Sequence, residues 1–127
     1  MQVLTATLTI AECSHASEPS STGVPSQVVK DVFKNFLTSG QYLALIQDTV
    51  LIAEKARNLR WVHGILLAGP DAVHAASALE MKCDEFLTFD KKFHKFKPAL
   101  DNLALRVCLP RNTNCLPSEY RQQPLAL

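Results

Sequence analysis

The sequence predicts an α/β fold in which short strands, paired in parallel, alternate with helices. Two observations favour this class: apolar runs of strand length alternate with longer segments of helical periodicity, and 47% of the 127 residues are hydrophobic. A chain of this length fits one domain and can bury a real core. Its net charge of +1 at pH 7 excludes a global field that attracts polyanions, so any such surface must be a local patch.

The first segment, VLTATLTI at residues 3–10, alternates apolar residues with threonine and predicts a strand at least in its first half. Residues 17–26 are rich in serine and proline and predict a loop. A helix is expected next, with Ser26 as its N-cap and Gly40 as its stop. Its apolar residues form one wide stripe: Val28, Val29, Val32, Phe33, Phe36 and Leu37.

The middle of the chain predicts a strand, a helix and a connection. YLALI at residues 42–46 is a continuous apolar run, which predicts a strand buried on both faces. Asp48 is expected to cap the following helix. The inner stripe of that helix should be Ile52, Ala56 and Leu59. WVHGILLAG at residues 61–69 is expected to be a loop with some helix.

A third helix is predicted from Pro70 to about Lys82, because proline suits a first helical turn. It carries a face of small side chains: Ala72, Ala75, Ala76 and Leu79. EFLTF at residues 85–89 predicts a second buried strand, and the following DKKFHKF predicts one or two helical turns.

A short last strand is predicted at residues 103–107, before a proline-rich segment that begins at Pro110. We therefore divide the chain into a domain at residues 1–109 and a C-terminal tail at residues 110–127. The tail is expected to be poorly ordered or to run across the surface.

Three acidic residues lie where strands or helices of the predicted fold begin or end: Glu12, Asp71 and Asp90. In a parallel α/β sheet, ligands gather outside the carboxyl ends of the strands. Carboxylates that cluster there repel one another unless a cation lies among them. Hard oxygen ligands suit Mg²⁺ or Mn²⁺, and such an ion can polarise a phosphodiester and lower the pKa of an attacking water.

Each acid also has a purely structural interpretation. Thr9 and Glu12 match the spacing of a capping box, in which the glutamate bonds the N-cap amide. Asp71 and Asp90 lie where anions stabilise a helix N-terminus. Asp84 precedes the strand at 85–89, at the end opposite Asp90, and is left out of the candidate site.

The segment PDAVHAASALEMKCDEFLTFDKKF, residues 70–93, resembles the C-terminal half of a PIN domain, the fold of the VapC-type toxin ribonucleases. The shared features are a Pro-Asp-Ala opening, a small-residue helix, a strand that ends Leu-Thr-x-Asp, and a following phenylalanine. TATLTIAE at residues 5–12 resembles the family's earlier segment, which leads to a glutamate. The resemblance covers roughly residues 3–107 and implies a PIN-like three-layer domain with a small parallel sheet flanked by helices.

This resemblance implies that Glu12, Asp71 and Asp90 are three of the family's four metal-binding acids. It also implies Mg²⁺- or Mn²⁺-dependent hydrolysis of RNA, often as a toxin neutralised by an antitoxin protein, and commonly as a homodimer. The lysines that follow Asp90 are either phosphate contacts or a solvated helix face: Lys91, Lys92 and Lys95.

The chain departs from the family pattern at its start. Glu12 is already the twelfth residue, and the family's first strand with its aspartate does not precede it. An N-terminally truncated, catalytically inactive PIN-like domain that acts as a binding or oligomerisation module is therefore the alternative to a nuclease. A plain α/β domain whose acids are only helix caps is a third interpretation.

The cysteines and the N-terminal segment bear on the compartment. The cysteines form no CxxC pair and match no zinc site: Cys13, Cys83, Cys108 and Cys115. No secretory signal is recognisable, and the apolar stretch at residues 3–10 is too short to span a bilayer. We expect a cytoplasmic protein with reduced thiols and no membrane partner.

Overall fold

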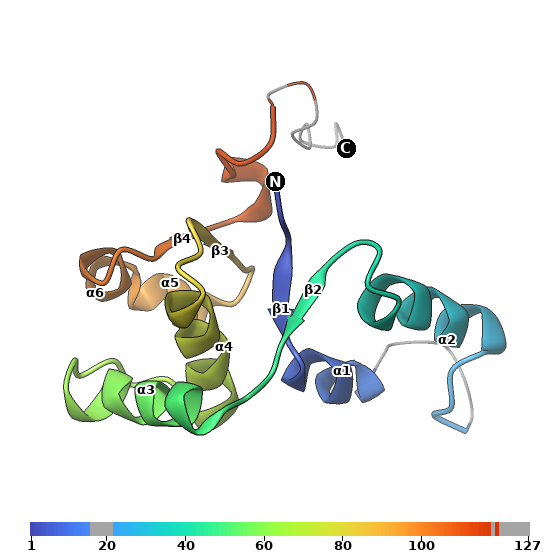
Figure 1. Cartoon of the computed structure of the whole chain (residues 1–127), viewed down its shortest axis with the longest axis horizontal. Helices are drawn as coiled ribbons and strands as arrows, with labels where there is room; N and C mark the ends of the chain where they lie inside the picture. Colours follow the sequence, from blue (N-terminus) through green and yellow to red (C-terminus); the bar gives the residue numbers. More distant parts are fainter. Residues whose placement is uncertain (16–21, 118, 120–127) are drawn as a thin grey trace. The chain divides into compact units, whose positions relative to one another are not determined.

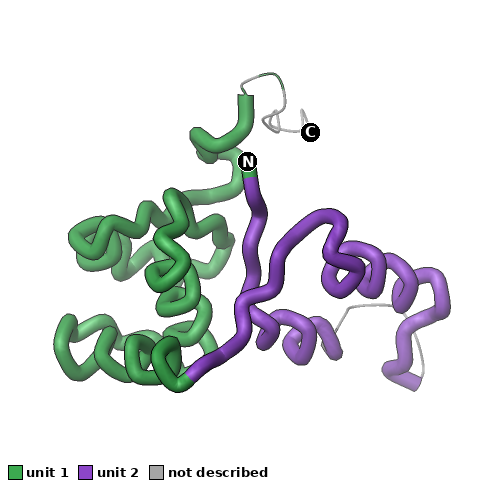
Figure 2. The backbone as a smooth tube through the Cα atoms, viewed as in Figure 1, with its two compact units in different colours: residues 1, 50–127 green, residues 2–49 purple. Residues whose placement is uncertain are grey.

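A computed structural model of the chain describes residues 1–15, 22–117 and 119. The chain divides into two compact units, one of residues 2–49 and one of residue 1 with residues 50–127 (Figure 2). Each unit contains one pair of parallel strands together with helices (Figure 1). The predicted α/β class with parallel strand pairing is therefore confirmed.

In the unit of residues 2–49, β1 (Leu4–Ala6) pairs in parallel with β2 (Ala44–Ile46). Between them lie α1 (Leu8–Glu12), the short η1 (Cys13–His15), α2 (Gln27–Phe33) and the π-helical η2 (Lys34–Thr38).

Both predicted ends of the second helical segment are confirmed. The Ser26 hydroxyl accepts a hydrogen bond from the Val29 amide at 3.4 Å and caps α2. Gly40 has a φ of +77°, a left-handed conformation that glycine adopts without a steric penalty, just after η2 ends.

The strand predicted at residues 3–10 is confirmed only in its first half. The Thr7 amide donates to the Ile46 carbonyl at 2.9 Å, and the Ile10 amide then donates back to the Thr7 carbonyl at 3.0 Å, which turns the chain into α1. The hydroxyls of Thr5 and Thr9 share a hydrogen bond of 2.7 Å at helical i,i+4 spacing. The prediction of a strand at least in the first half of this segment is therefore confirmed, and residues 8–10 belong to α1.

The strands are less buried than predicted. In the first unit Ile46 is buried, but Tyr42, just before β2, is 57% exposed. In the second unit Leu87 of β3 (Glu85–Leu87) is 48% exposed. Burial on both faces was therefore wrong for both strands, and the physical reason is that each strand lies in a two-stranded sheet rather than in the middle of a wide one.

In the unit of residues 50–127, α3 (Val50–Trp61) packs against α4 (Gly69–Glu80). The predicted face of small residues makes this contact possible, since alanines and a serine of α4 are buried: Ala72, Ala75, Ala76, Ser77 and Ala78. The segment at residues 61–69 is a loop with helix at its two ends, as predicted, because Trp61 closes α3 and Gly69 opens α4. The connection between them, residues 62–68, is not helical. Its side chains alternate instead, with Ile65 and Leu67 buried and Leu66 exposed.

The second strand pair lies in the same unit, where β3 pairs in parallel with β4 (Arg106–Cys108). Two short helices connect them, α5 (Lys91–Lys95) and α6 (Lys97–Asn102). The Phe93 side chain of α5 is buried and its ring lies 4.8 Å from that of Phe86 on β3. This contact fixes α5 beside the end of β3.

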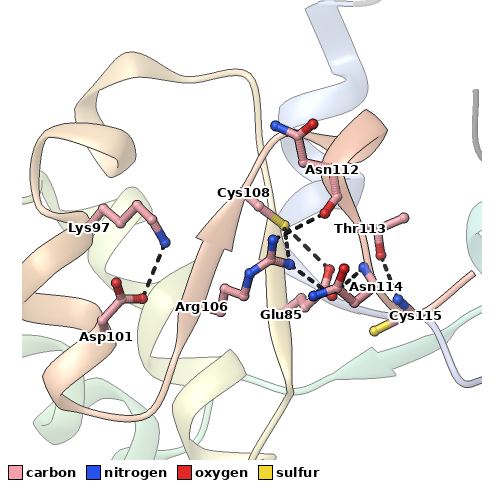
Figure 3. Close-up of polar contacts among 9 residues, drawn as sticks. All are labelled: Glu85, Lys97, Asp101, Arg106, Cys108, Asn112, Thr113, Asn114 and Cys115. Carbon is pink, nitrogen blue, oxygen red and sulfur yellow. Dashed lines mark hydrogen bonds and ion pairs between the residues drawn. The ribbon is translucent and has the colours of Figure 1, made fainter. Parts of the chain in front are cut away.

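A buried carboxylate lies at the start of β3 and holds the chain that follows β4 (Figure 3). The side chain of Glu85 is 6% exposed, and its Oε1 lies 3.0 Å from Arg106 Nη1. The same oxygen accepts a hydrogen bond from the Asn114 amide at 2.7 Å, while Cys108 Sγ donates to Oε2 at 3.3 Å. Arg106 Nη2 also donates to the Asn112 carbonyl at 3.1 Å. The segment after η3 (Pro110–Asn112) is thus anchored on the surface, as far as Cys115.

The predicted boundary between residues 109 and 110 stays a prediction, and residues 118 and 120–127 of the predicted tail lie outside the described residues.

The environment of Glu85 sets its pKa. Burial raises the pKa of the Glu85 carboxyl. Hydrogen bonds from the Asn114 amide and from the Thr113, Cys108 and Cys115 side chains lower it by more than burial raises it, so the pKa lies below its ordinary value of 4.5. A depressed carboxyl pKa contributes stability that is present above the unfolded-state pKa. That contribution is lost as the pH falls through the folded-state pKa.

We predict that Glu85→Gln lowers the free energy of unfolding at pH 7 by about 1–3 kcal/mol, because Arg106 loses its charged partner and the buried acceptor is altered. Urea denaturation measures this loss, with Glu54→Gln on the exposed side of α3 as the matched control. The gap between the wild type and Glu85→Gln should shrink as the pH falls through the lowered folded-state pKa of Glu85, where the wild-type carboxyl also becomes protonated. A gap of the same size at all pH values would contradict the role given to the ionised carboxylate.

Candidate active site

Asp71 lies in the first turn of α4, where the sequence predicts it. Pro70 occupies the start of the helix, and the N-cap residue Ala68 makes no side-chain cap bond. Asp71 is therefore not the N-cap residue, although its charge lies near the positive end of the helix dipole. Its side chain is 19% exposed, so the carboxylate is sheltered but reachable.

Asp90 follows β3 and is the N-cap of α5, which confirms the structural interpretation of this residue. Its Oδ1 accepts a hydrogen bond from the Lys92 amide at 2.9 Å. The Asp90 amide in turn donates to the Thr88 hydroxyl at 3.0 Å, and His94 Nε2 lies 2.8 Å from the Thr88 carbonyl. These contacts hold the chain between β3 and α5 in place, with Asp90 bonded through Oδ1.

Lys92 links the two aspartates. Its Nζ lies 3.7 Å from Asp71 Oδ2, while its backbone amide bonds Asp90. The structure therefore brings Asp71 and Asp90 into one neighbourhood although 18 residues separate them in the sequence. The Lys92 side chain is 68% exposed, so its ammonium is solvated. A cation that binds Asp71 more strongly than this ammonium can displace it.

The predicted basic residues Lys91, Lys92 and Lys95 lie on α5, and all three are exposed. The Lys95 ammonium lies 5.6 Å from the ring centroid of Phe96. Because Phe93 anchors the opposite face of this short helix in the core, the lysines present their charge to solvent beside the two aspartates. His94 of the same helix contacts the Thr88 carbonyl through its Nε2.

Glu12 is the last residue of α1 and belongs to the unit of residues 2–49. The predicted capping box with Thr9 was wrong, because the N-cap of α1 is Thr7 and the helix ends, rather than begins, at Glu12. The convergence of Glu12 with the two aspartates of the other unit stays a prediction.

The donor set of Asp71 and Asp90 suits a hard cation, since Mg²⁺ is usually held by one or two carboxylates and completes its shell with water and substrate oxygens. Within residues 1–15, 22–117 and 119, no group of three or more His, Cys, Asp or Glu side chains is arranged to hold a metal. Lys92 contacts both aspartates, and a metal centre shared by Asp71 and Asp90 stays a prediction.

Two features of this region were not foreseen from the sequence: the contact of Lys92 with Asp71, and the burial of Glu85 at the other end of β3. Both are contacts between residues about twenty positions apart or more, and no local periodicity encodes them. The signal that the sequence offered for the first contact was a basic residue, Lys92, two positions after Asp90.

Comparison with known proteins gives one match. The family model described as PIN domain matches residues 2–97. No curated protein and no solved structure matches the chain.

We predict that Lys92→Gln strengthens Mn²⁺ binding about two- to fivefold, because removing an exposed ammonium beside Asp71 removes a competitor worth less than about 1 kcal/mol. Isothermal titration with Mn²⁺ measures the change, and Lys91→Gln is the matched control because it removes the same charge one position away. Equal affinities for the two variants would contradict the competition between Lys92 and the cation.

Proposed function

Because this chain belongs to the PIN domain family, a nuclease-like fold, we propose that it is a metal-dependent endoribonuclease that hydrolyses RNA phosphodiesters. The observation that carries the proposal is the gathering of Asp71 and Asp90 around Lys92 at the end of β3. Each aspartate lies in the motif that resembles the family's acids.

In this proposal Asp71 and Asp90 hold Mg²⁺ or Mn²⁺, and Glu12 supplies the third carboxylate. The ion, when bound, polarises the phosphodiester and lowers the pKa of a water that attacks phosphorus. Asp90 keeps its position because Oδ1 is tied to the Lys92 amide, so its other oxygen is oriented. Asp71 is oriented by the rigid first turn of α4. Lys92 neutralises Asp71 until the cation and the substrate arrive.

The substrate contact proposed for α5 is electrostatic. Lys91, Lys92 and Lys95 carry exposed ammonium groups within five residues of Asp90, and such groups attract phosphate without reading sequence. The net charge of +1 supports a local contact of this kind rather than a general affinity for polyanions. RNA binding at α5 should therefore weaken as the salt concentration rises.

The biological role follows from the resemblance to VapC-type proteins. We propose a toxin of a toxin–antitoxin pair, neutralised by a partner protein and active as a homodimer in the cytoplasm. Four free cysteines within the described residues fit a compartment that keeps thiols reduced. None of the described helices has the length and apolar character that crossing a membrane requires.

A second candidate is a PIN-like module that binds a partner without hydrolysis. The Lys92 ammonium beside Asp71 favours it, since a lysine can balance a carboxylate permanently where no metal is needed. Titration with Mn²⁺ separates the two candidates, because tight stoichiometric binding by the whole chain contradicts the second.

We predict that the chain cleaves RNA in the presence of Mg²⁺ or Mn²⁺ and that an Asp71→Asn, Asp90→Asn double variant loses at least about a hundredfold in rate, because metal ligands are lost. Cleavage of a labelled RNA, followed over time, measures the rate. Asp84→Asn is the matched control, because this exposed aspartate lies at the opposite end of β3. Wild-type activity no higher than that of the double variant overturns the proposed function.

We also predict that Glu12→Gln lowers the cleavage rate by a similar factor while the protein stays folded, since Glu12 is exposed and its replacement empties no core position. The rate is measured as above, and thermal unfolding is the control for stability. An unchanged rate removes Glu12 from the proposed centre and leaves the roles of the two aspartates to the preceding experiment.

A further inference from the structure

A stacked arginine and tryptophan lie on the solvent face of α3. The guanidinium carbon of Arg57 is 4.7 Å from the ring centroid of Trp61, one helical turn along. Arg57 Nε donates to Asn58 Oδ1 at 3.3 Å, which holds the guanidinium plane in place. Trp61 is 73% exposed, and Arg60 beside it is also exposed. The exposed ring and the guanidinium beside it together present an aromatic and cationic surface to solvent.

A hollow of about 370 Å³ opens on the same helix. Leucines from three parts of the chain give it an apolar lining, among them Leu59, Leu79 and Leu103. Its polar groups come from α3 and the residues just after it, with Asn58 and His63 among them. Asn58 thus joins the two features, because it lines the hollow and also bonds Arg57. An apolar recess of this size with a few polar groups is typical of a ligand site.

We infer that Arg57, Trp61 and the hollow beside Asn58 form a second RNA-binding site, in which a base stacks on the Arg57–Trp61 pair and a neighbouring base enters the hollow. This inference rests on the proposed function, since it takes single-stranded RNA as the ligand. Every base offers a flat face to an aromatic ring, and stacking on one is worth about 1–3 kcal/mol per base. The terminal N–H groups of Arg57 and Arg60 can bind the phosphates between them.

The charge of this surface favours RNA over a protein partner. Arg57 and Arg60 lie within one turn of each other, and His63 adds a group that hydrogen-bonds base edges. Lys55 also lines the hollow, but its ammonium is paired with Glu80 at 2.7 Å. Glu54 is the acidic residue of α3 that lines the hollow. An amide, an imidazole and a carboxylate around an apolar floor suit the edges of a nucleobase, which carries donors and acceptors in one plane.

The site should extend the substrate beyond the aspartates. The connection at residues 62–68 limits the distance between Trp61 and the start of α4, because a chain spans at most about 3.3–3.6 Å per residue. A strand of RNA that crosses this distance would contact both places at once, and linked contacts raise the overall affinity without new interactions at either one.

The experiment uses the fluorescence of Trp61, which is the one tryptophan among the 127 residues and so reports only on this site. The whole chain is titrated with a short single-stranded oligouridine RNA in a buffer free of divalent cations, so that the RNA is not hydrolysed. We expect saturable quenching of Trp61 by base stacking, and a Kd that rises with salt concentration. Arg57→Gln should raise that Kd about tenfold, while Arg111→Gln, an exposed arginine of η3, should leave it unchanged.

Anisotropy of a fluorescently labelled RNA gives a second measurement that does not depend on tryptophan. Trp61→Ala should weaken binding about tenfold by this measurement, with far-UV circular dichroism as the control for folding. RNA binding that leaves Trp61 fluorescence unchanged overturns the inference. So does an Arg57→Gln variant that binds RNA like the wild type, or one that instead loses self-association in sedimentation, which would make the surface a protein interface.

The outcomes separate this inference from the proposed function. Cleavage of RNA by a protein whose Trp61 does not respond overturns the second site and leaves the nuclease. Quenching of Trp61 by RNA in a protein that never cleaves supports the second site and overturns the nuclease.

Discussion

Two carboxylates of like charge repel each other unless positive charge or hydrogen-bond donors lie beside them, and in this protein Lys92 contacts both aspartates. Its ammonium lies beside Asp71, and its backbone amide bonds Asp90. Both contacts depend on α5 starting shortly after β3, where the buried Phe93 ring packs against Phe86 and holds the helix beside the strand. The candidate site is therefore a consequence of one aromatic contact that fixes a five-residue helix.

The two ends of β3 show how the same kind of group serves stability or chemistry. At its start, Glu85 is almost completely buried, contacts Arg106 at 3.0 Å and accepts further hydrogen bonds, so its charge is fully balanced by the protein. Beyond its end, Asp90 is bonded through one oxygen, and the pair of Asp71 with the exposed Lys92 is longer, at 3.7 Å. A carboxylate whose charge is neutralised by fixed partners stabilises the fold. A carboxylate whose charge is neutralised by an exposed lysine can exchange that lysine for a cation.

The sequence predicted those elements whose causes are local. The stop at Gly40, the cap at Ser26 and the small-residue helix α4 each follow from the conformational preference or size of residues at the element itself. Predictions failed where the outcome depended on partners. Burial of the strands depended on how many strands pair with each, and each has one partner among the described residues.

The same distinction applies to the functional residues. A motif identified Asp71 and Asp90, but the contact that joins them comes from Lys92, whose side chain reaches back to a helix that begins 23 residues earlier. The Arg57–Trp61 stack is a local contact instead, because i,i+4 spacing on α3 places the two side chains on one face once the helix extends to Trp61, which the sequence assigned to the following connection. Local spacing therefore predicts which side chains meet on one helix, and strand pairing with core packing decides which helices then meet. In this chain the metal-binding proposal depends on the second kind of contact and the proposed RNA-stacking surface on the first, so a substitution that loosens Phe93 should disturb the aspartates and leave Trp61 unaffected.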